Sequence, residues 1–342
     1  MNNIEVKYNP YELKFTTPFN TSKSKISNRK GFIISIKSSS GKIGVGDVCP
    51  LSEFGSETYK EAENQIANLK IDLKVDSNNL NNSLKNILYK YNSYPAFKHG
   101  LEQAIINLIC IENNISIAQL LNLKLRKVIN VNAVIGFLSP EEATFLAANL
   151  VKAGFKTLKV KTGRNNFDED FNTVRSIRNA VGDEIKIRID SNGKWSAEQA
   201  DDCLNKLSDF SIEYAEQPVR TIENFITLRK KSSFPLAADE SIRDFETAEK
   251  FITHKLVDFV ILKPMILGGL ISTLEIIELA DKNNIIPVIT SSFESTVGRA
   301  NAVIAASVCK SEIAHGLAVS KYLENDFTKE KYPIVKGKIK VF

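Results

Sequence analysis

The stretch "LKVKTG", Leu158–Gly163, decides the fold, because it places two lysines one residue apart in an otherwise apolar strand. Side chains alternate along a β-strand, so Lys159 and Lys161 point to one face and the residues between and beside them point to the other. If this second face packs against helices, both lysines point into the space that the sheet encloses. The stretch therefore predicts a barrel strand with lysines on its inner face.

The sequence around this stretch repeats one unit: from about residue 129, short apolar strands alternate with amphipathic helices. The predicted strands are "INVNAVIG", "TLKVKTG", "IKIRIDSN", "SIEYAEQP", "PLAADES", "VDFVILKP", "IIPVITSSF" and the weaker "IAHGLA". Local signals mark three helix starts: the capping boxes "SPEE" from Ser139 and "SAEQ" from Ser196, and a cap at Asp244. Eight strands and about seven helices predict a closed (β/α)7β barrel of the TIM type. A doubly wound open sheet is the alternative, but no glycine-rich phosphate loop follows any early strand.

The chain before the barrel has a different layout. Extended segments such as "GFIISIKSS" and "GKIGVGDV" come first, and helical patterns such as "FKHGLEQAIINLICIENN" follow, which is typical of an α+β domain. The tail "KYLENDFTKEKYPIVKGKIKVF" no longer fits the barrel repeat. We therefore predict an α+β domain over residues 1–125, a barrel over residues 126–317, and a tail over residues 318–342 that packs back on the first domain.

The composition excludes several classes of protein. The 45 basic and 40 acidic residues give a net charge of +5, and the lysines do not cluster with aromatic residues, so no nucleic-acid surface is predicted. No stretch offers about eighteen uninterrupted apolar residues, and the start does not resemble a signal peptide, so no membrane segment is predicted. Four widely spaced cysteines without a C-x-x-C pair indicate reduced thiols. A cytoplasmic location is expected.

Polar residues recur at the ends of the predicted strands that follow Lys161. Each is one strand-plus-helix unit from the last, and they are Asp190, Glu216, Asp239 and Lys263. Residues at the carboxyl ends of barrel strands converge at one end of the barrel, where barrel enzymes have their active sites. Three massed carboxylates repel each other unless a divalent cation neutralises them, and all-oxygen ligation suits Mg²⁺ or Mn²⁺.

Simpler explanations exist for each of these residues. A single aspartate or lysine at a strand end is usually a solvated loop residue or a helix cap, and the lysines can form ion pairs with the carboxylates. The common register favours a site, because six polar residues occupy five successive strands. The three histidines, His99, His254 and His315, have no spacing typical of a zinc site.

This set of residues resembles the enolase superfamily in its muconate-lactonizing subgroup. The resemblance rests on the K-x-K of Lys159 and Lys161, on the three carboxylates, and on Lys263, and it covers nearly the whole chain. It implies that the α+β domain caps the barrel. It also implies that Asp190, Glu216 and Asp239 hold Mg²⁺ beside a small-molecule carboxylate substrate. A relative of mandelate racemase would carry a catalytic histidine in "TSSFESTVG", where this chain has none.

The same resemblance implies a role for each lysine. Lys161 would abstract the proton α to the substrate carboxylate and give an enediolate. Such a base must be neutral near pH 7, and both Mg²⁺ and the charge of Lys159 disfavour protonated Lys161. Lys159 would also contact the substrate carboxylate. Lys263 would face the other side of the enediolate, as a second acid in an epimerase or as a stabilising cation in a dehydratase.

Within the subgroup, "LKPMILGG" and "SSFES" resemble the o-succinylbenzoate synthases of menaquinone biosynthesis. We therefore expect syn dehydration of 2-succinyl-6-hydroxy-2,4-cyclohexadiene-1-carboxylate. Dipeptide epimerases and N-acylamino-acid racemases are the alternatives, but dipeptide epimerases typically carry D-x-D at the end of strand eight, and "EIAHGLAVSKY" has none. A barrel that binds metal as a sensor or scaffold is the non-enzymatic alternative, and the intact lysines argue against it.

Specificity is expected in two cap loops, "FTTPFNTSKSK" and "CPLSEFGSE", and at Ser291 and Ser292. These serines are candidates to bind the remote substrate carboxylate, and capping of the following helix is an equally good explanation. In the cap, "GVGDVCP" places Asp47 where many relatives carry glutamate.

Overall fold

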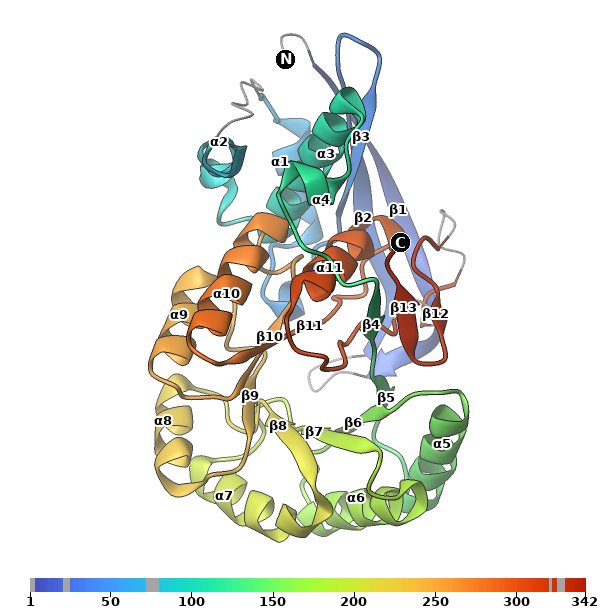
Figure 1. Cartoon of the computed structure of the whole chain (residues 1–342), viewed down its shortest axis with the longest axis vertical. Coiled ribbons are helices and arrows are strands. Elements are labelled where there is room, and N and C mark those ends of the chain that lie inside the picture. Colours follow the sequence, from blue (N-terminus) through green and yellow to red (C-terminus); the bar gives the residue numbers. More distant parts are fainter. Residues whose placement is uncertain (1–3, 21–24, 72–79, 320–321, 325–329) are drawn as a thin grey trace.

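The computed structural model describes residues 4–20, 25–71, 80–319, 322–324 and 330–342 (Figure 1). Part of the first predicted specificity loop, residues 21–24, therefore lies outside the described residues. Within the described chain no helix is long and apolar enough to cross a membrane.

The amino-terminal part is an antiparallel sheet packed against helices. Its strands pair in the order β1 (Glu5–Asn20), β2 (Lys25–Lys37) and β3 (Ile43–Val48). The helices of this part are α1 (Tyr59–Ala67), α2 (Leu80–Leu88), α3 (Pro95–Asn113) and α4 (Ile117–Leu120). Helix α3 packs so closely on β3 that there is no room for a side chain at Gly46. A Cβ built there would lie 1.9 Å from the carbonyl oxygen of Gly100. The glycines of "GKIGVGDV" thus permit this close approach.

The central part is one parallel sheet that curls into a barrel, with helices on its outer face (Figure 1). Its strands pair in chain order, and they are β5 (Ala133–Ile135), β6 (Thr157–Lys161), β7 (Lys186–Asp190), β8 (Ile212–Glu216), β9 (Leu236–Ala238), β10 (Phe259–Leu262) and β11 (Ile286–Ile289). The helices are α5 (Pro140–Lys152), α6 (Phe167–Val181), α7 (Ala197–Lys206), α8 (Ile222–Lys231), α9 (Phe245–Thr253), α10 (Leu270–Lys282) and α11 (Thr296–Val308). The predicted alternation of strands and helices is confirmed.

The predicted capping signals are confirmed as well. Ser139, Ser196 and Asp244 each accept a hydrogen bond from the backbone three residues later, and in each case that residue's side chain bonds back. Each cap satisfies backbone N–H groups that the first turn leaves unpaired, so it fixes where the helix begins.

The eighth predicted strand, "IAHGLA", closes the barrel without forming a regular ladder. His315 bridges Val131, and Gly316 bridges Thr290, both in parallel. A side chain at Gly316 would not fit, because its Cβ would lie 2.5 Å from the hydroxyl oxygen of Thr290. The segment therefore joins the two edges of the seven-stranded sheet, and the predicted barrel with an α+β partner is confirmed.

The end of the chain pairs with segments outside the seven-stranded sheet. Strand β13 (Lys338–Lys340) pairs with β12 (Ile334–Val335) and with β4 (Val128–Asn130), which precedes the seven-stranded sheet. Leu323 bridges Phe15 of β1, so the tail also contacts the amino-terminal sheet. The division at residues 125 and 318 stays a prediction.

Inside the barrel, Arg188 of β7 connects strands to the closing segment. Its guanidinium lies 2.6 Å from a carboxylate oxygen of Glu213 and donates to the carbonyl of Ala314 at 2.8 Å and to Asn132 at 3.2 Å. It also lies 4.7 Å from the ring centre of Tyr214. Arg188 is fully buried, so these contacts replace part of the water that its charge has lost, while its Nη2 has no hydrogen-bond partner among the described residues.

We expect Arg188→Lys to lower the free energy of unfolding by about 1–3 kcal/mol, because a lysine keeps the charge but cannot reach all three acceptors. Urea unfolding checks this, with Arg175→Lys on the exposed face of α6 as the control, where a change within about 0.5 kcal/mol is expected. Equal stability of the two variants would contradict a role for Arg188 in closing the barrel.

Candidate active site

The structure brings the six predicted polar residues together at the carboxyl ends of the strands. Lys161, Asp190 and Glu216 are direct neighbours in the parallel pairing of β6, β7 and β8, so they lie at one depth and point the same way. The residues on the other face of β6, Leu158 and Val160, pack in the core between sheet and helices. This confirms the alternation on which the sequence analysis rested.

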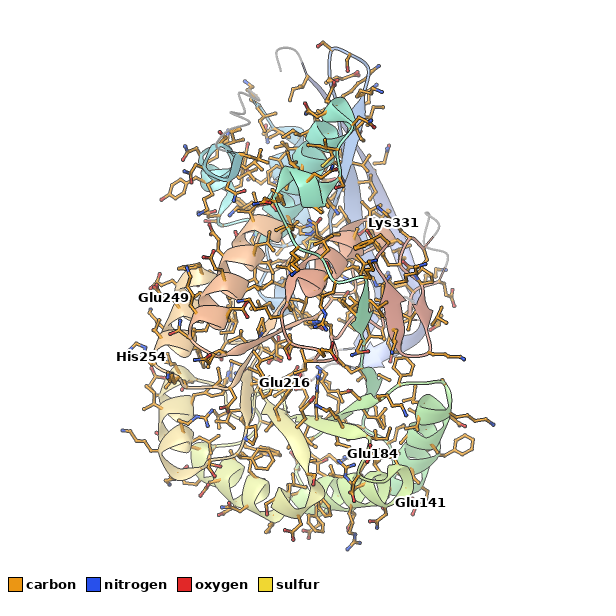
Figure 2. All side chains as sticks on the ribbon, in the orientation of Figure 1. Glu141, Glu184, Glu216, Glu249, His254 and Lys331 are labelled. Atoms are coloured by element: carbon orange, nitrogen blue, oxygen red, sulfur yellow. The ribbon has the colours of Figure 1, made fainter. Side chains whose placement is uncertain are left out.

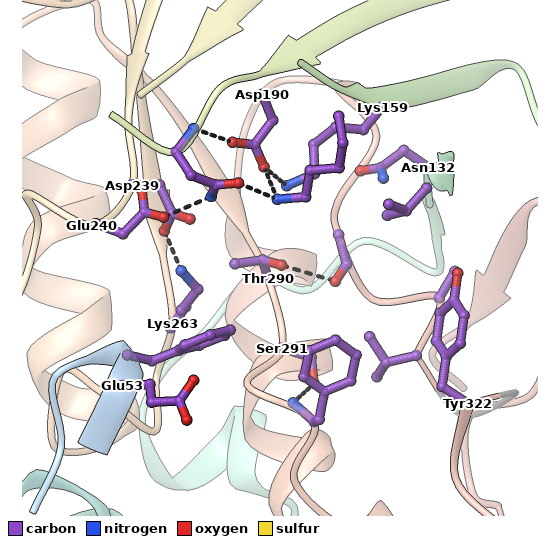
Figure 3. Close-up of a pocket in the computed structure, with 18 residues that line it drawn as sticks. Glu53, Asn132, Lys159, Asp190, Asp239, Glu240, Lys263, Thr290, Ser291 and Tyr322 are labelled. Atoms are coloured by element: carbon purple, nitrogen blue, oxygen red, sulfur yellow. Dashed lines mark hydrogen bonds and ion pairs between the residues drawn. The ribbon is translucent and has the colours of Figure 1, made fainter. Parts of the chain in front are cut away.

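The lysines and carboxylates pair closely. The Lys161 ammonium lies 2.6 Å from Asp190, and Lys159 lies 2.6 Å from Glu216 and 3.1 Å from Asp190. Lys263 forms an ion pair with Asp239. Figure 3 shows Lys159 and Lys263 on opposite sides of the pocket. The ion pairs that the sequence left as an alternative are thus present.

Burial and these contacts shift the pKa values in the site. Burial raises the pKa of Glu216, which Lys159 opposes and the charges of Asp190 and Asp239 reinforce. For Asp190, Lys161 and Lys159 outweigh the effect of burial and hold its pKa well below its ordinary value. For Lys159, the carboxylates outweigh burial and raise its pKa well above the ordinary value. Lys159 therefore stays a cation at neutral pH.

Sequence reasoning missed two further polar residues of the site, Asn192 and Glu240. Lys161 donates to the amide oxygen of Asn192 at 2.8 Å, and the Asn192 amide nitrogen donates to Glu240 at 2.7 Å. Both residues lie one or two positions beyond a predicted ligand, in "IDSN" and "ADES". Polar clusters after a strand end were the signal that could have found them.

The site is rich in carboxyl groups, and burial raises the pKa of two of them, Glu216 and Glu240. It holds four carboxylates against three lysines, and one oxygen of Glu240 is buried without a hydrogen-bond partner. An all-oxygen set of carboxyl groups fits a divalent cation such as Mg²⁺. Among the described residues, no three acidic, histidine or cysteine side chains are placed to coordinate one metal ion, because each predicted ligand forms an ion pair with a lysine. Asp190, Glu216 and Asp239 as ligands therefore stay a prediction.

The histidines take no part in the site. His99 and His315 are buried elsewhere, and burial lowers the pKa of each, to about 4 and about 3, so both are neutral. Figure 2 shows His254 on the outside of the barrel, whereas Glu216 lies within it.

The pocket is closed by segments from distant parts of the chain. Five of the six predicted polar residues line it, and Glu216 does not. The other lining residues are Glu53, Phe54, Asn132, Val134, Asn192, Glu240, Thr290, Ser291, Phe293, Gly316, Ala318, Val319 and Tyr322. The turn Ser52–Phe54 of the second predicted cap loop reaches the pocket, and the Lys263 ammonium lies 5.0 Å from the ring centre of Phe54. From the described residues of the closing segment, Gly316, Ala318, Val319 and Tyr322 line the pocket.

The two predicted substrate serines differ. Ser291 lines the pocket, and its hydroxyl accepts the N–H of Phe293 at 3.0 Å. Ser292 is buried, does not line the pocket, and its hydroxyl has no hydrogen-bond partner. Neither caps α11, whose N-cap residue is Ser295. Substrate binding at these serines stays a prediction.

Lysines and carboxylates gathered at the carboxyl ends of barrel strands occupy the position where barrel enzymes have their active sites. Two family models match the chain: "Enolase C-terminal domain-like" over residues 142–342 and "MenC, N-terminal domain" over residues 4–108. The chain belongs to the enolase superfamily, as its motifs predicted.

Curated relatives differ in how much they share with the chain. The o-succinylbenzoate synthase of Thermobifida fusca is 35% identical over 204 residues, which cover 59% of this chain and 62% of that protein. The L-Ala-D/L-Glu epimerase of Francisella tularensis subsp. novicida is 26% identical over 350 residues, which cover 99% and 98%. Protein PHYLLO, chloroplastic, of Arabidopsis thaliana is 26% identical over 339 residues, 87% of this chain but only 20% of that protein. The chain thus spans less than two thirds of the synthase and of PHYLLO.

Solved structures confirm the fold. The L-Ala-D/L-Glu epimerase of Bacillus subtilis superposes with a TM-score of 0.88 at 24% identity, over 99% of this chain and 96% of that one. The dipeptide epimerase of Cytophaga hutchinsonii, solved with Mg and the dipeptide D-Ala-L-Val, has a TM-score of 0.86 at 25% identity, over 98% and 92%.

Proposed function

We propose that the chain abstracts the proton α to the carboxylate of a small substrate, with Lys161 as the base. The observation that carries this is that Lys161 and Lys263 line one pocket, and each is held by a buried carboxylate. Lys161 lies on the same strand as Lys159, which Figure 3 shows across the pocket from Lys263. Asp190 and Asn192 both accept hydrogen bonds from Lys161, so they fix the direction of its ammonium nitrogen. A base held in one direction transfers a proton without first losing side-chain freedom.

The other charged residues would bind the metal, bind the substrate carboxylate and stabilise the intermediate. A divalent cation held by Asp190, Glu216 and Asp239 would supply positive charge beside the substrate carboxylate. Lys159 stays protonated, so it can contact that carboxylate. Lys263, whose pKa Asp239 and Glu240 raise despite burial, places a cation on the other side of the intermediate.

We further propose that the substrate is 2-succinyl-6-hydroxy-2,4-cyclohexadiene-1-carboxylate. The α-proton passes to the nitrogen of Lys161, the bond from carbon 6 to its hydroxyl breaks, and the same proton leaves with the hydroxyl as water. The product is 2-succinylbenzoate, whose aromatic ring drives the elimination. The match to the MenC N-terminal domain, the synthase relative and the apolar closing segment near Gly316 support this choice.

Epimerisation of a dipeptide or an N-acylamino acid is the second candidate, and the relatives favour it over the synthase. Epimerases match over more of the chain, and lysines on opposite sides of a pocket suit a reaction that removes a proton from one face and returns it to the other. Glu53 of the cap turn also lines the pocket and could face a substrate ammonium. Ala318 and Val319 oppose it, because these described lining residues near Gly316 offer an ammonium no carboxylate.

One comparison separates these candidates. We expect the purified protein with Mg²⁺ to dehydrate the cyclohexadiene with a kcat/KM at least about 100-fold above that for epimerising L-Ala-L-Glu or N-succinyl amino acids. Product absorbance follows the first reaction, and deuterium incorporation from D2O follows the others. A higher kcat/KM for either epimerisation would overturn the synthase proposal, and the proton-abstraction proposal would stand. No conversion of any of the three substrates would contradict both.

A further inference from the structure

Asp47, at the end of β3, joins the cap to the barrel. It is fully buried, and one oxygen of its carboxylate accepts both the backbone N–H of Ser295 at 3.0 Å and its hydroxyl at 2.7 Å. The other oxygen accepts the hydroxyl of Tyr11 at 2.8 Å. Ser295 is the N-cap residue of α11, but its hydroxyl does not cap its own helix. A side chain of the cap therefore binds the first donors of a barrel helix.

The surrounding residues leave this contact little freedom. A Cβ at Gly298, in the first turn of α11, would lie 2.7 Å from the carboxylate of Asp47. From α3, the side chain of Gln103 accepts the N–H of Asp47 at 3.0 Å and donates to the carbonyl of Val297 at 2.7 Å. The cap and the start of α11 are thus joined through both the side chain and the backbone of Asp47.

The loop that Asp47 holds forms a wall of the pocket. Ser291 and Phe293 precede Ser295, and both line the pocket. Phe293 has a φ of 59°, a conformation that costs an aromatic residue about 1–3 kcal/mol and persists only where the surroundings enforce it. Its ring lies 5.3 Å from Phe15 and 6.5 Å from Phe54 of the cap turn, measured between ring centres. Asp47 thus ties the loop before α11, one wall of the pocket, to the strand that precedes the cap turn Ser52–Phe54, the other wall.

We propose that Asp47 is a positioning residue that sets the affinity for the part of the substrate remote from the lysines. It does so by holding Ser291 and Phe293 against the cap turn, so that both walls are formed before the substrate binds. This rests on the proposed function only in taking the pocket as the substrate site. Loss of Asp47 should therefore raise KM and leave the proton transfer at the lysines largely intact.

Kinetics of Asp47→Ala test this, with whichever of the three substrates the wild-type protein converts, so failure of the synthase proposal does not prevent the test. We expect KM to rise about tenfold or more while kcat changes by less than about threefold. Asp47→Asn should recover most of the affinity, because its amide oxygen can still accept both donors of Ser295. A fall in kcat at unchanged KM, or an unchanged KM, would overturn the proposal.

Two controls separate positioning from general stability. Ile36→Ala removes a buried side chain at the far end of the same sheet and should lower the Tm without changing KM. Ser295→Ala and Gly298→Ala disturb the contact between Asp47 and α11 from the barrel side. They test the proposal even if Asp47→Ala does not fold. Each should raise KM, and Ser295→Ala should add little to the effect of Asp47→Ala.

Hydrogen exchange, which needs no substrate, tests the positioning role of Asp47 a second time. We expect amide hydrogen exchange of residues 291–295 to be faster in Asp47→Ala than in the wild type, and unchanged in Ile36→Ala. Equal exchange of this loop in Asp47→Ala and the wild type would overturn the proposal, whichever reaction the protein catalyses.

Discussion

Replacing Lys161 with alanine should lower kcat between about 10²-fold and 10⁴-fold, because the variant loses the only base that the proposal places on its side of the substrate. The loss should appear in the proton-transfer step itself. Exchange of the substrate α-proton with D2O, followed by NMR, measures that step without relying on product formation. Lys156→Ala, at an exposed position just before the same strand, is the matched control and should exchange at the wild-type rate.

Exchange at the wild-type rate in Lys161→Ala would show that another group is the base. Lys263→Ala sharpens the result, because it separates the two candidate reactions. In an epimerase, each lysine exchanges the proton of one stereoisomer, so Lys263→Ala would still exchange the isomer that faces Lys161. In the dehydratase, Lys263 stabilises charge, so its loss should slow exchange of the single substrate.

Removing divalent metal should abolish turnover, and Mg²⁺ should restore it. The crowded carboxyl groups raise the pKa of Glu216 and Glu240, so the site disfavours further negative charge, and the substrate adds a carboxylate that a metal would neutralise. Asp239→Asn should raise the Mg²⁺ concentration needed for half activity without unfolding the barrel. Its control is Asp209→Asn, an exposed position outside the pocket, which should leave the Mg²⁺ requirement unchanged.

Metal binding also has a readout that does not depend on activity. A cation present at about 100 times its Kd stabilises the folded state by about 2.7 kcal/mol, so Mg²⁺ should raise the Tm of the wild type and raise that of Asp239→Asn less. Full activity of the chelated, metal-free protein would contradict the metal assignment. The carboxylates would then serve only to form ion pairs with the lysines.

The sequence alone determined the barrel and the convergence of its polar residues. Alternation in "LKVKTG" placed Lys159 and Lys161 on one face, and capping residues such as Ser139 fixed where helices begin. Both are local effects, set by neighbours a few residues apart. Once the strands are parallel, the geometry of the barrel requires residues at their carboxyl ends, such as Asp190, to meet at one end.

Only the tertiary structure decided which of these groups touch. Lys263 pairs with Asp239, Asn192 joins Lys161 to Glu240, and Asp47 binds a residue 248 positions away. Periodicity specifies the direction in which a side chain points, but not its partner. A contact between distant segments depends on how cap and barrel pack, on side-chain length, and on where a glycine permits close approach, so the sequence placed Asp47 in a cap loop and the fold made it a contact of α11.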